Sequence, residues 1–169
     1  MSVSLVNHVG VTVPDIDTAF TWYQNVLGCY GHVPPTEVTD DGSYFGNLVK
    51  NLFGERFEGM RIAHLTTADG IGIELFQFLT PATEVPERTF EYWRGGIFHF
   101  CLTVDSVETT AATIAEAGGR QLSKVWRLFN NKDYEVAYCQ DPWGTVIELC
   151  NRPYTAVWAN HEPPGNAED

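Results

Sequence analysis

Alternation of apolar residues with polar or small ones marks two separate stretches of the chain as β-strands. The first is LVNHVGVTV at residues 5–13, and the second is IFHFCLTV at residues 97–104. A period of two is typical of a strand with one covered face. Each stretch is followed by apolar residues at the three- and four-residue spacing of a helix, over Asp17–Leu27 and over Asp105–Ala117, and glycine ends both segments. Both halves of the chain are therefore predicted to begin with a strand and a helix.

Two further strands, joined by a turn, follow in each half. They are predicted at Arg61–Thr66 and Ile71–Phe78 in the first half, and at Glu135–Cys139 and Thr145–Cys150 in the second. One more strand is expected before each of these hairpins, and in the second half it covers Arg120–Trp126. The order in each half is then βαβββ, so the sequence predicts an α+β fold made of two tandem βαβββ modules.

The two halves also share chemistry-bearing residues. His8 and His99 open the near-identical stretches NHVGVTVPDIDTA and FHFCLTVDSVETTA, and each half later carries the tripeptide Ile-Glu-Leu, which contains Glu74 and Glu148. The sequence is therefore an internal repeat with one histidine and one glutamate in each copy.

The first copy is longer than the second because it contains an insertion. His8 and Glu74 are 66 positions apart, whereas His99 and Glu148 are 49 apart, and the excess of 17 falls near residues 43–59, SYFGNLVKNLFGERFEG. The apolar residues of this segment have helical spacing. A lid, a dimer contact and a packed helix without a separate role are the three interpretations that remain open.

Length and composition predict one compact domain. A chain of 169 residues that is 44% hydrophobic can bury one good core. We expect a single domain over residues 1–152, with module one at 4–80, a linker at 81–95 and module two at 96–152. A C-terminal arm is expected at 153–169, where proline, asparagine and acidic residues are frequent.

Charge excludes several classes of partner. The net charge is −12 and only 10 residues are lysine or arginine, whereas nucleic acids and anionic membranes are bound by clustered cations. No apolar stretch is long enough to span a membrane, and the N-terminal residues do not have the pattern of a signal peptide. A cytoplasmic protein is expected. Four cysteines without CxxC spacing are predicted to be buried, reduced thiols, namely Cys29, Cys101, Cys139 and Cys150.

The repeated histidines and glutamates suggest a metal site. Two imidazoles and two carboxylates form a complete ligand set for Mn, Fe(II), Co or Ni, or for Zn with expanded coordination. Equivalent strands of tandem copies are related by a pseudo-twofold axis, so His8, Glu74, His99 and Glu148 can converge. Each residue alone is more often structural, but four matching positions favour one divalent metal ion.

Other histidines are weaker candidates. His64 falls on a predicted strand and could line a pocket. His32 and His161 have loop-like surroundings, in which solvation is the expected role.

The motifs resemble the vicinal oxygen chelate superfamily, which includes glyoxalase I, methylmalonyl-CoA epimerase, extradiol dioxygenases and the fosfomycin and bleomycin resistance proteins. The similar pieces are NHVGVTVPDIDTAFTWYQNVLG, IELFQFLTP, GGIFHFCLTVDSVE and QDPWGTVIELCN, and with their spacing they cover most of residues 5–152. The resemblance implies paired βαβββ modules curled around one metal. It also implies that His8, Glu74, His99 and Glu148 are the ligands and that the protein is a homodimer, in which ligands can be shared between chains.

The resemblance also implies a class of reaction. A full ligand set that includes Glu74 favours a lyase or isomerase that binds vicinal oxygens and works through a metal-bound enediolate, as glyoxalase I and the epimerase do. Glu148 is the first candidate for the base and Glu74 the second. The alternatives are a non-haem Fe(II) dioxygenase that uses His8, His99 and Glu148, and a metal-free binding or resistance protein.

The substrate is expected to be a small molecule. Coenzyme A and glutathione carry several negative groups, which match the acidic composition poorly. Four residues on or near predicted strands are candidates for substrate binding: Lys124, Trp126, Arg127 and Tyr138. An ordinary sheet surface is the alternative for each of them.

Overall fold

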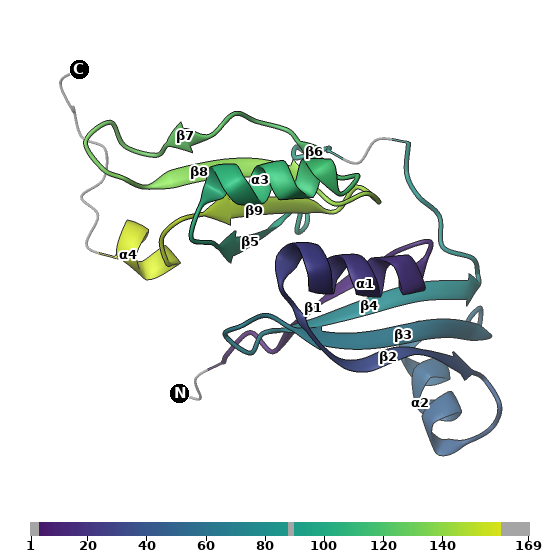
Figure 1. Ribbon diagram of the computed structural model, residues 1–169. Coiled ribbons are helices and arrows are strands. Elements are labelled where there is room, and N and C mark those ends of the chain that lie inside the picture. Colours follow the sequence, from purple (N-terminus) through teal and green to yellow (C-terminus); the bar gives the residue numbers. More distant parts are fainter. Residues whose placement is uncertain (1–3, 88–89, 160–169) are drawn as a thin grey trace. The chain divides into compact units, whose positions relative to one another are not determined.

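The computed structural model describes residues 4–87 and 90–159 of the chain. It divides into two compact units, residues 1–88 and 89–169 (Figure 1). Each unit contains its own sheet and its own long helix. The predicted α+β fold with two tandem modules is confirmed.

The first unit contains a four-stranded sheet in the order β1-β4-β3-β2. Its elements are β1 (His8–Thr12), α1 (Ile16–Leu27), β2 (Tyr30–Thr39), α2 (Tyr44–Phe53), β3 (Gly59–Thr66) and β4 (Gly72–Thr80). β1 and β4 pair in parallel, whereas β4 with β3 and β3 with β2 are antiparallel. The first and last strands of this unit are therefore neighbours.

The second unit repeats this order as β5-β9-β8-β6, with a parallel pair of first and last strands. Its elements are β5 (Phe100–Thr103), α3 (Val107–Glu116), β6 (Arg120–Gln121), β7 (Trp126–Arg127), β8 (Glu135–Gln140), β9 (Val146–Cys150) and α4 (Tyr154–Trp158). The strand expected at Arg120–Trp126 is divided into the short strands β6 and β7, which both pair with β8.

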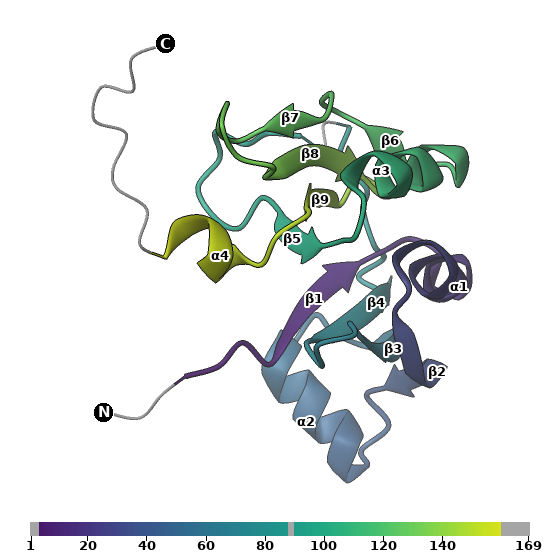
Figure 2. The same cartoon turned by 60° about the vertical axis from the view of Figure 1, so that its left-hand side comes forward.

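Local sequence signals explain where α1 begins and ends and where α3 begins. The Asp15 side chain accepts a hydrogen bond from the Thr18 N–H at the start of α1, and Gly28 ends that helix with a left-handed φ of 69°. Ser106 caps α3 in the same way, so α3 begins at Val107 rather than at Asp105. α3 then contacts β6, β8 and β9 of its own sheet (Figure 2).

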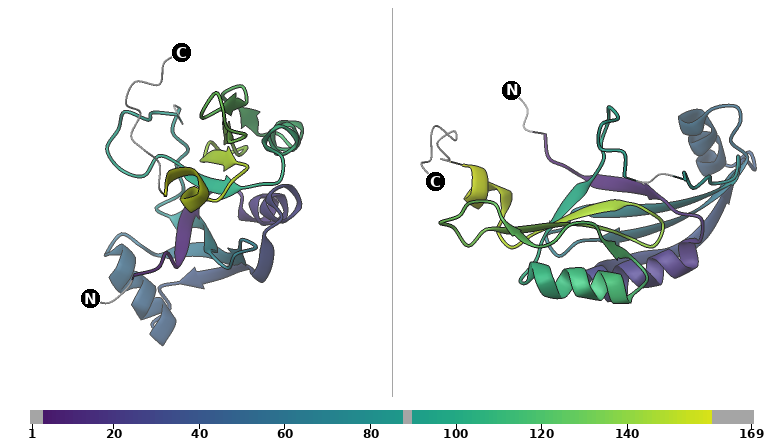
Figure 3. Two further views of the ribbon diagram at one scale, coloured as in Figure 1. Left: turned by 90° about the vertical axis from the view of Figure 1, so that its left-hand side faces the viewer. Right: turned by 90° about the horizontal axis from the view of Figure 1, so that it is seen from above.

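The insertion in the first unit forms helix α2, and it packs on the sheet face opposite α1 (Figure 3, right). Val49 of α2 is buried in a cluster with Phe57, Met60 and Ile62, against which Phe76 and Phe78 pack. Side chains alternate along β4, so Phe76 and Phe78 share a face with Glu74, while Ile73 and Leu75 are buried on the other face. The insertion therefore covers part of the face that carries Glu74.

The arm predicted at 153–169 contains the short helix α4, and residues 160–169, including His161, lie outside the described residues. Within the described residues, no helix is both long and apolar enough to cross a membrane. His32 lies on strand β2 rather than in a loop, and its Nε2 is 2.9 Å from Thr66 Oγ1.

The prediction that all four cysteines are buried is wrong in part. Cys29 and Cys139 are buried, which raises the pKa of each thiol to about 11. Cys101 is exposed and Cys150 is partly exposed. These two lie on the face of the second sheet that α3 does not cover, because their positions alternate with the buried Ile147 and Leu149.

Candidate metal-binding and catalytic residues

In the first unit, the parallel pairing of β1 and β4 brings His8 to Glu74. Gly10 is the register partner of Glu74, and His8 lies two residues earlier on the same face of the strand. The distance from His8 Nε2 to Glu74 Oε2 is 3.3 Å. His64 lies directly opposite Glu74 on β3, with 3.4 Å between its Nδ1 and Glu74 Oε1. The Glu74 carboxylate therefore lies between two imidazoles.

In the second unit, the equivalent strands bring His99 to Glu148 in the same register. Cys101 is the partner of Glu148, and His99 lies two residues before Cys101, as His8 does before Gly10. The distance from His99 Nε2 to Glu148 Oε2 is 3.0 Å. Tyr138 on β8 lies opposite Glu148, in the position that His64 has in the first unit. The repeat therefore extends from the sequence to the side-chain geometry.

These contacts leave the two glutamates in different surroundings. Glu74 has one imidazole near each carboxylate oxygen, whereas Glu148 has a histidine at Oε2 and Tyr138 beside it. The Tyr138 ring is perpendicular to the His99 ring at a centroid distance of 5.4 Å. Burial, followed by the negative charge of Glu148, raises the pKa of Tyr138 above its ordinary value. Tyr138 therefore remains a neutral phenol, able to donate a hydrogen bond, throughout the neutral pH range.

The donor atoms fit a divalent cation. Two ligands that each lie about 2.1 Å from one ion, at an angle of about 90–110°, are about 3.0–3.4 Å apart. The histidine–glutamate separations of 3.3, 3.4 and 3.0 Å all fall in this range. His99 Nδ1 is buried and has no hydrogen-bond partner among the described residues. His99 meets the Glu148 carboxylate through its other ring nitrogen, Nε2, and a cation between Nε2 and Oε2 would need little rearrangement.

A pair of thiols lies beside Glu148. Interaction between the two thiol side chains is the largest influence on both groups: it raises the pKa of Cys101 and lowers that of Cys150. Burial is the next cause of the higher Cys101 pKa, and the charge of Glu148 also contributes. This pair could not be found from the sequence, because 49 positions separate the two cysteines and only strand register brings them together.

The predicted substrate-binding residues divide into two groups. Lys124, Trp126 and Arg127 line a pocket of about 460 Å³ in the second unit, and the Lys124 ammonium lies 3.7 Å from the centroid of the Trp126 ring. The pocket is also lined by Glu108, Gln121, Val125 and Glu135. Tyr138 and Glu148 are not among the lining residues. Of the four candidates, the structure thus brings Tyr138 next to Glu148 and places the other three around a separate pocket.

His64 is the residue near the site that sequence reasoning ranked too low. It was expected only as a pocket-lining residue, yet its Nδ1 lies 3.4 Å from Glu74 Oε1. The available signal was its position on β3, since the residue opposite Glu74 in an antiparallel pair must share its face. The register of that pair was not known from the sequence, so the contact was not predicted.

Comparison with known families agrees with the fold and the repeat. The family model described as the Glyoxalase/Bleomycin resistance protein/Dioxygenase superfamily matches residues 5–149. The chain belongs to this superfamily. It is 27% identical to a 2-epi-5-epi-valiolone epimerase from Actinomyces sp, over 97% of this chain and 91% of that protein. Superfamily membership and this relative support an activity of the isomerase or lyase type.

Solved structures of the superfamily have the same fold. A glyoxalase family protein from Bacillus cereus is 22% identical, with a TM-score of 0.70 over 89% of this chain and 95% of that one. A mutant of the fosfomycin resistance protein FosX from Listeria monocytogenes, in complex with Mn(II) and 1S,2S-dihydroxypropylphosphonic acid, is 14% identical. Its TM-score is 0.58, over 92% of this chain and 98% of that one. The resemblance inferred from the sequence motifs is confirmed.

Proposed function

We propose that this protein is a divalent-metal-dependent epimerase that inverts a carbon centre beside a carbonyl in a small substrate with vicinal oxygens. The observation that carries the proposal is the same histidine–glutamate contact in both units, His8 with Glu74 and His99 with Glu148. Among the reactions of the superfamily, epimerisation is favoured by the epimerase relative, which is 27% identical over 97% of the chain. A glyoxalase I-like lyase would use the same residues.

The proposed ligands of the cation are His8, Glu74, His99 and Glu148, and Mn, Fe, Co, Ni or Zn would suit this donor set. The metal would act as a Lewis acid that polarises the carbonyl and offsets negative charge on its oxygen. The ligand set is supported by the separations of the donor atoms and by the identical register of the two pairs.

Glu148 is proposed as the base that removes the proton from carbon. Histidines lie near both oxygens of Glu74, whereas Glu148 meets His99 through Oε2 and has more freedom to reach a substrate proton. His99 would orient the Glu148 carboxylate, and the Tyr138 phenol beside it would donate a hydrogen bond to a substrate oxygen.

Epimerisation also requires a proton to be returned to the opposite face of the same carbon. Unless solvent supplies this proton, a second group besides Glu148 must act as the acid, and Glu74 is the candidate for it. The neighbouring His64 imidazole can exchange a proton with Glu74 at their separation of 3.4 Å. The two glutamates would thus have related roles, with Glu148 removing the proton and Glu74 returning it.

The charge of the protein indicates the class of substrate. A net charge of −12 opposes the approach of a molecule that carries several negative groups. A neutral polyhydroxylated ketone has vicinal oxygens and no such penalty, and the valiolone named for the relative is a compound of this class. We propose such a ketone as the substrate class.

The test is turnover of 2-epi-5-epi-valiolone in deuterated water by metal-free protein reloaded in turn with Mn, Co, Ni, Zn or Fe(II). Proton NMR should show the epimer forming with one carbon-bound proton replaced by deuterium. Glu148→Gln should lower kcat by about 10²–10⁴ while the fold is kept, because the amide cannot accept the proton. Glu116→Gln, an exposed change on α3, is the matched control and should retain wild-type turnover.

Several results would contradict the proposal. Near wild-type turnover of Glu148→Gln would remove Glu148 as the base. Oxygen consumption by the iron form, without epimer, would indicate a dioxygenase. A protein that binds the ketone but takes up no metal would be a binding or resistance protein. The expected homodimer is checked separately, by light scattering of the purified protein.

A further inference from the structure

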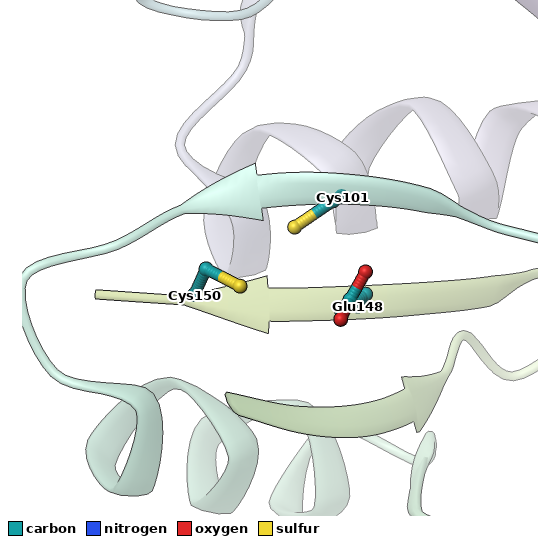
Figure 4. Close-up of side chains that lie close together, drawn as sticks. All are labelled: Cys101, Glu148 and Cys150. Carbon is teal, nitrogen blue, oxygen red and sulfur yellow. The ribbon is translucent and has the colours of Figure 1, made fainter. Parts of the chain in front are cut away.

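A second cluster of metal-ligating side chains lies in the second unit, and it shares only Glu148 with the histidine–glutamate pairs. Cys101 Sγ, Cys150 Sγ and a carboxylate oxygen of Glu148 all lie within 4.8 Å of one another. Figure 4 shows the three side chains on the neighbouring strands β5 and β9. Strand register produces the cluster, because Glu148 is the partner of Cys101, and Cys150 follows two residues later on the same face.

The corresponding positions of the first unit show that the repeat itself does not require this cluster. They are occupied by Gly10 and Phe76, which have the same register relation to Glu74. A Cβ atom added to Gly10 would lie 3.3 Å from a ring carbon of Phe76, so the aromatic ring fills this space in the first unit. The second unit has two thiols in place of the glycine and the ring.

We propose that Cys101, Cys150 and Glu148 form a binding site for a soft divalent cation of the Zn²⁺ or Cd²⁺ type. Thiolate ligands select such ions, and two sulfurs with one carboxylate leave a fourth tetrahedral position for water. Around zinc, sulfurs at about 2.3 Å and an oxygen at about 2.1 Å are about 3.6–3.8 Å apart. Side-chain rotations that bring the three atoms together by about 1 Å would complete this geometry.

Exposure and stoichiometry fit this site. Cys101 is exposed, so an ion can reach the thiols from solvent. Binding forms two sulfur–metal bonds, breaks two S–H bonds and releases two protons to the buffer, with no change in oxidation state. The two remaining cysteines, Cys29 and Cys139, are buried and cannot take up an ion in this way.

Sharing of Glu148 couples the two ways of binding a cation. A carboxylate drawn toward the thiols moves away from His99, from which Glu148 Oε2 is 3.0 Å away. Occupation of the thiol site by Cd²⁺, or by Zn²⁺ beyond one ion per chain, would therefore slow turnover by displacing the base. This consequence for turnover rests on the proposed function, whereas the thiolate site itself does not.

Titration of the reduced, metal-free full-length protein with Cd²⁺ tests the site, because cadmium bound to thiolate has an ultraviolet charge-transfer band. We expect the band to saturate at one Cd²⁺ per chain and to disappear in the double variant Cys101→Ser/Cys150→Ser. Cys139→Ala is the matched control and should retain the full band. His99→Ala should also retain it, since this histidine belongs to the other ligand set.

Alkylation gives a second measurement that needs no variant. Cd²⁺ should slow the reaction of Cys101 and Cys150 with iodoacetamide by at least tenfold, as followed by peptide mass spectrometry. Absence of the band in the wild type, its survival in the double variant, or alkylation rates unaffected by Cd²⁺ would each overturn the thiolate site. None of these results would affect epimerase turnover measured with Mn or Ni, so failure of the two proposals can be distinguished.

Discussion

Gly72 is the position at which one added methyl group should disturb the candidate metal site without touching a ligand. Gly72 is the register partner of His8, and a Cβ atom at Gly72 would lie 2.8 Å from His8 Cβ and 3.3 Å from the Asn7 carbonyl oxygen. Its φ is not among the positive values found for other glycines, so Gly72→Ala adds a steric contact without backbone strain. The effect of the substitution should therefore be confined to the start of β1.

The size of the disturbance follows from contact distances. Carbon atoms in van der Waals contact are about 3.5–4.0 Å apart, so His8 Cβ must move by about 1 Å. The Gly72 N–H donates to the Asn7 carbonyl at 2.9 Å, and this bond prevents the strands from simply separating. Metal–ligand distances tolerate changes of only about 0.2 Å. We therefore expect a loss of about 10–100-fold in metal affinity, or about 1.4–2.7 kcal/mol.

Isothermal titration of metal-free protein with Mn²⁺ or Ni²⁺ measures this loss, and circular dichroism confirms that the variant is folded. Gly95→Ala is the matched control, because a Cβ atom there meets nothing within 4 Å and its φ is not positive either. That control should bind metal as the wild type does. A Gly72→Ala protein whose affinity stays within twofold of the wild type would refute the argument that His8 is a ligand held in place by this strand pair.

Three further predictions concern the site, the acid range and the insertion. His99→Ala should lower metal affinity sharply in the same titration, and unchanged stoichiometric binding would remove it from the ligand set. Hydrogen bonds from Arg61 hold the pKa of Asp17 below its ordinary value, so their contribution to stability is present above about pH 4 and is lost as the pH falls. Asp17→Asn should therefore lower the urea midpoint at pH 7, and the midpoints of the variant and the wild type should converge near pH 2. Phe57→Ala should cost about 3–5 kcal/mol of unfolding free energy, because the Phe57 side chain is 1% exposed beneath α2. Leu52→Ala is the control: Leu52 is 68% exposed, so the change should stay within about 0.5 kcal/mol. Equal urea midpoints for these two variants would contradict the packing described for the insertion.

The sequence was sufficient to predict the repeat and to single out its two histidines and two glutamates. Alternation identified the first and last strands of each copy, but the parallel register that places His8 beside Glu74 and His99 beside Glu148 is known only from the structure. The ends of strand β2 were harder to predict from the sequence, because the strand contains Pro34 and Pro35. β2 is an edge strand with register shifts, and proline is tolerated there since fewer backbone N–H groups must pair.

Contacts that depend on the antiparallel register or on diagonal neighbours could not be predicted. The position of His64 opposite Glu74 requires the β3–β4 register, and a shift of one residue would move His64 to the other face of the sheet. The approach of Cys101 to Cys150 requires the offset between β5 and β9. Cys101 also shows why composition misleads here, since a cysteine in an apolar stretch was expected to be buried and is exposed.

The parallel pairing of first and last strands also determines when the histidine–glutamate contacts can form during synthesis of the chain. As a ribosome synthesises the first unit, β1 emerges early, yet in the described sheet its partner is β4, the last strand of that unit. A further 66 positions must therefore be translated after His8 before Glu74 is present, and a further 49 after His99 before Glu148 is present. A chain that stops before β4 or before β9 has the histidine but not its carboxylate partner, so each contact can form only after its whole unit has been translated.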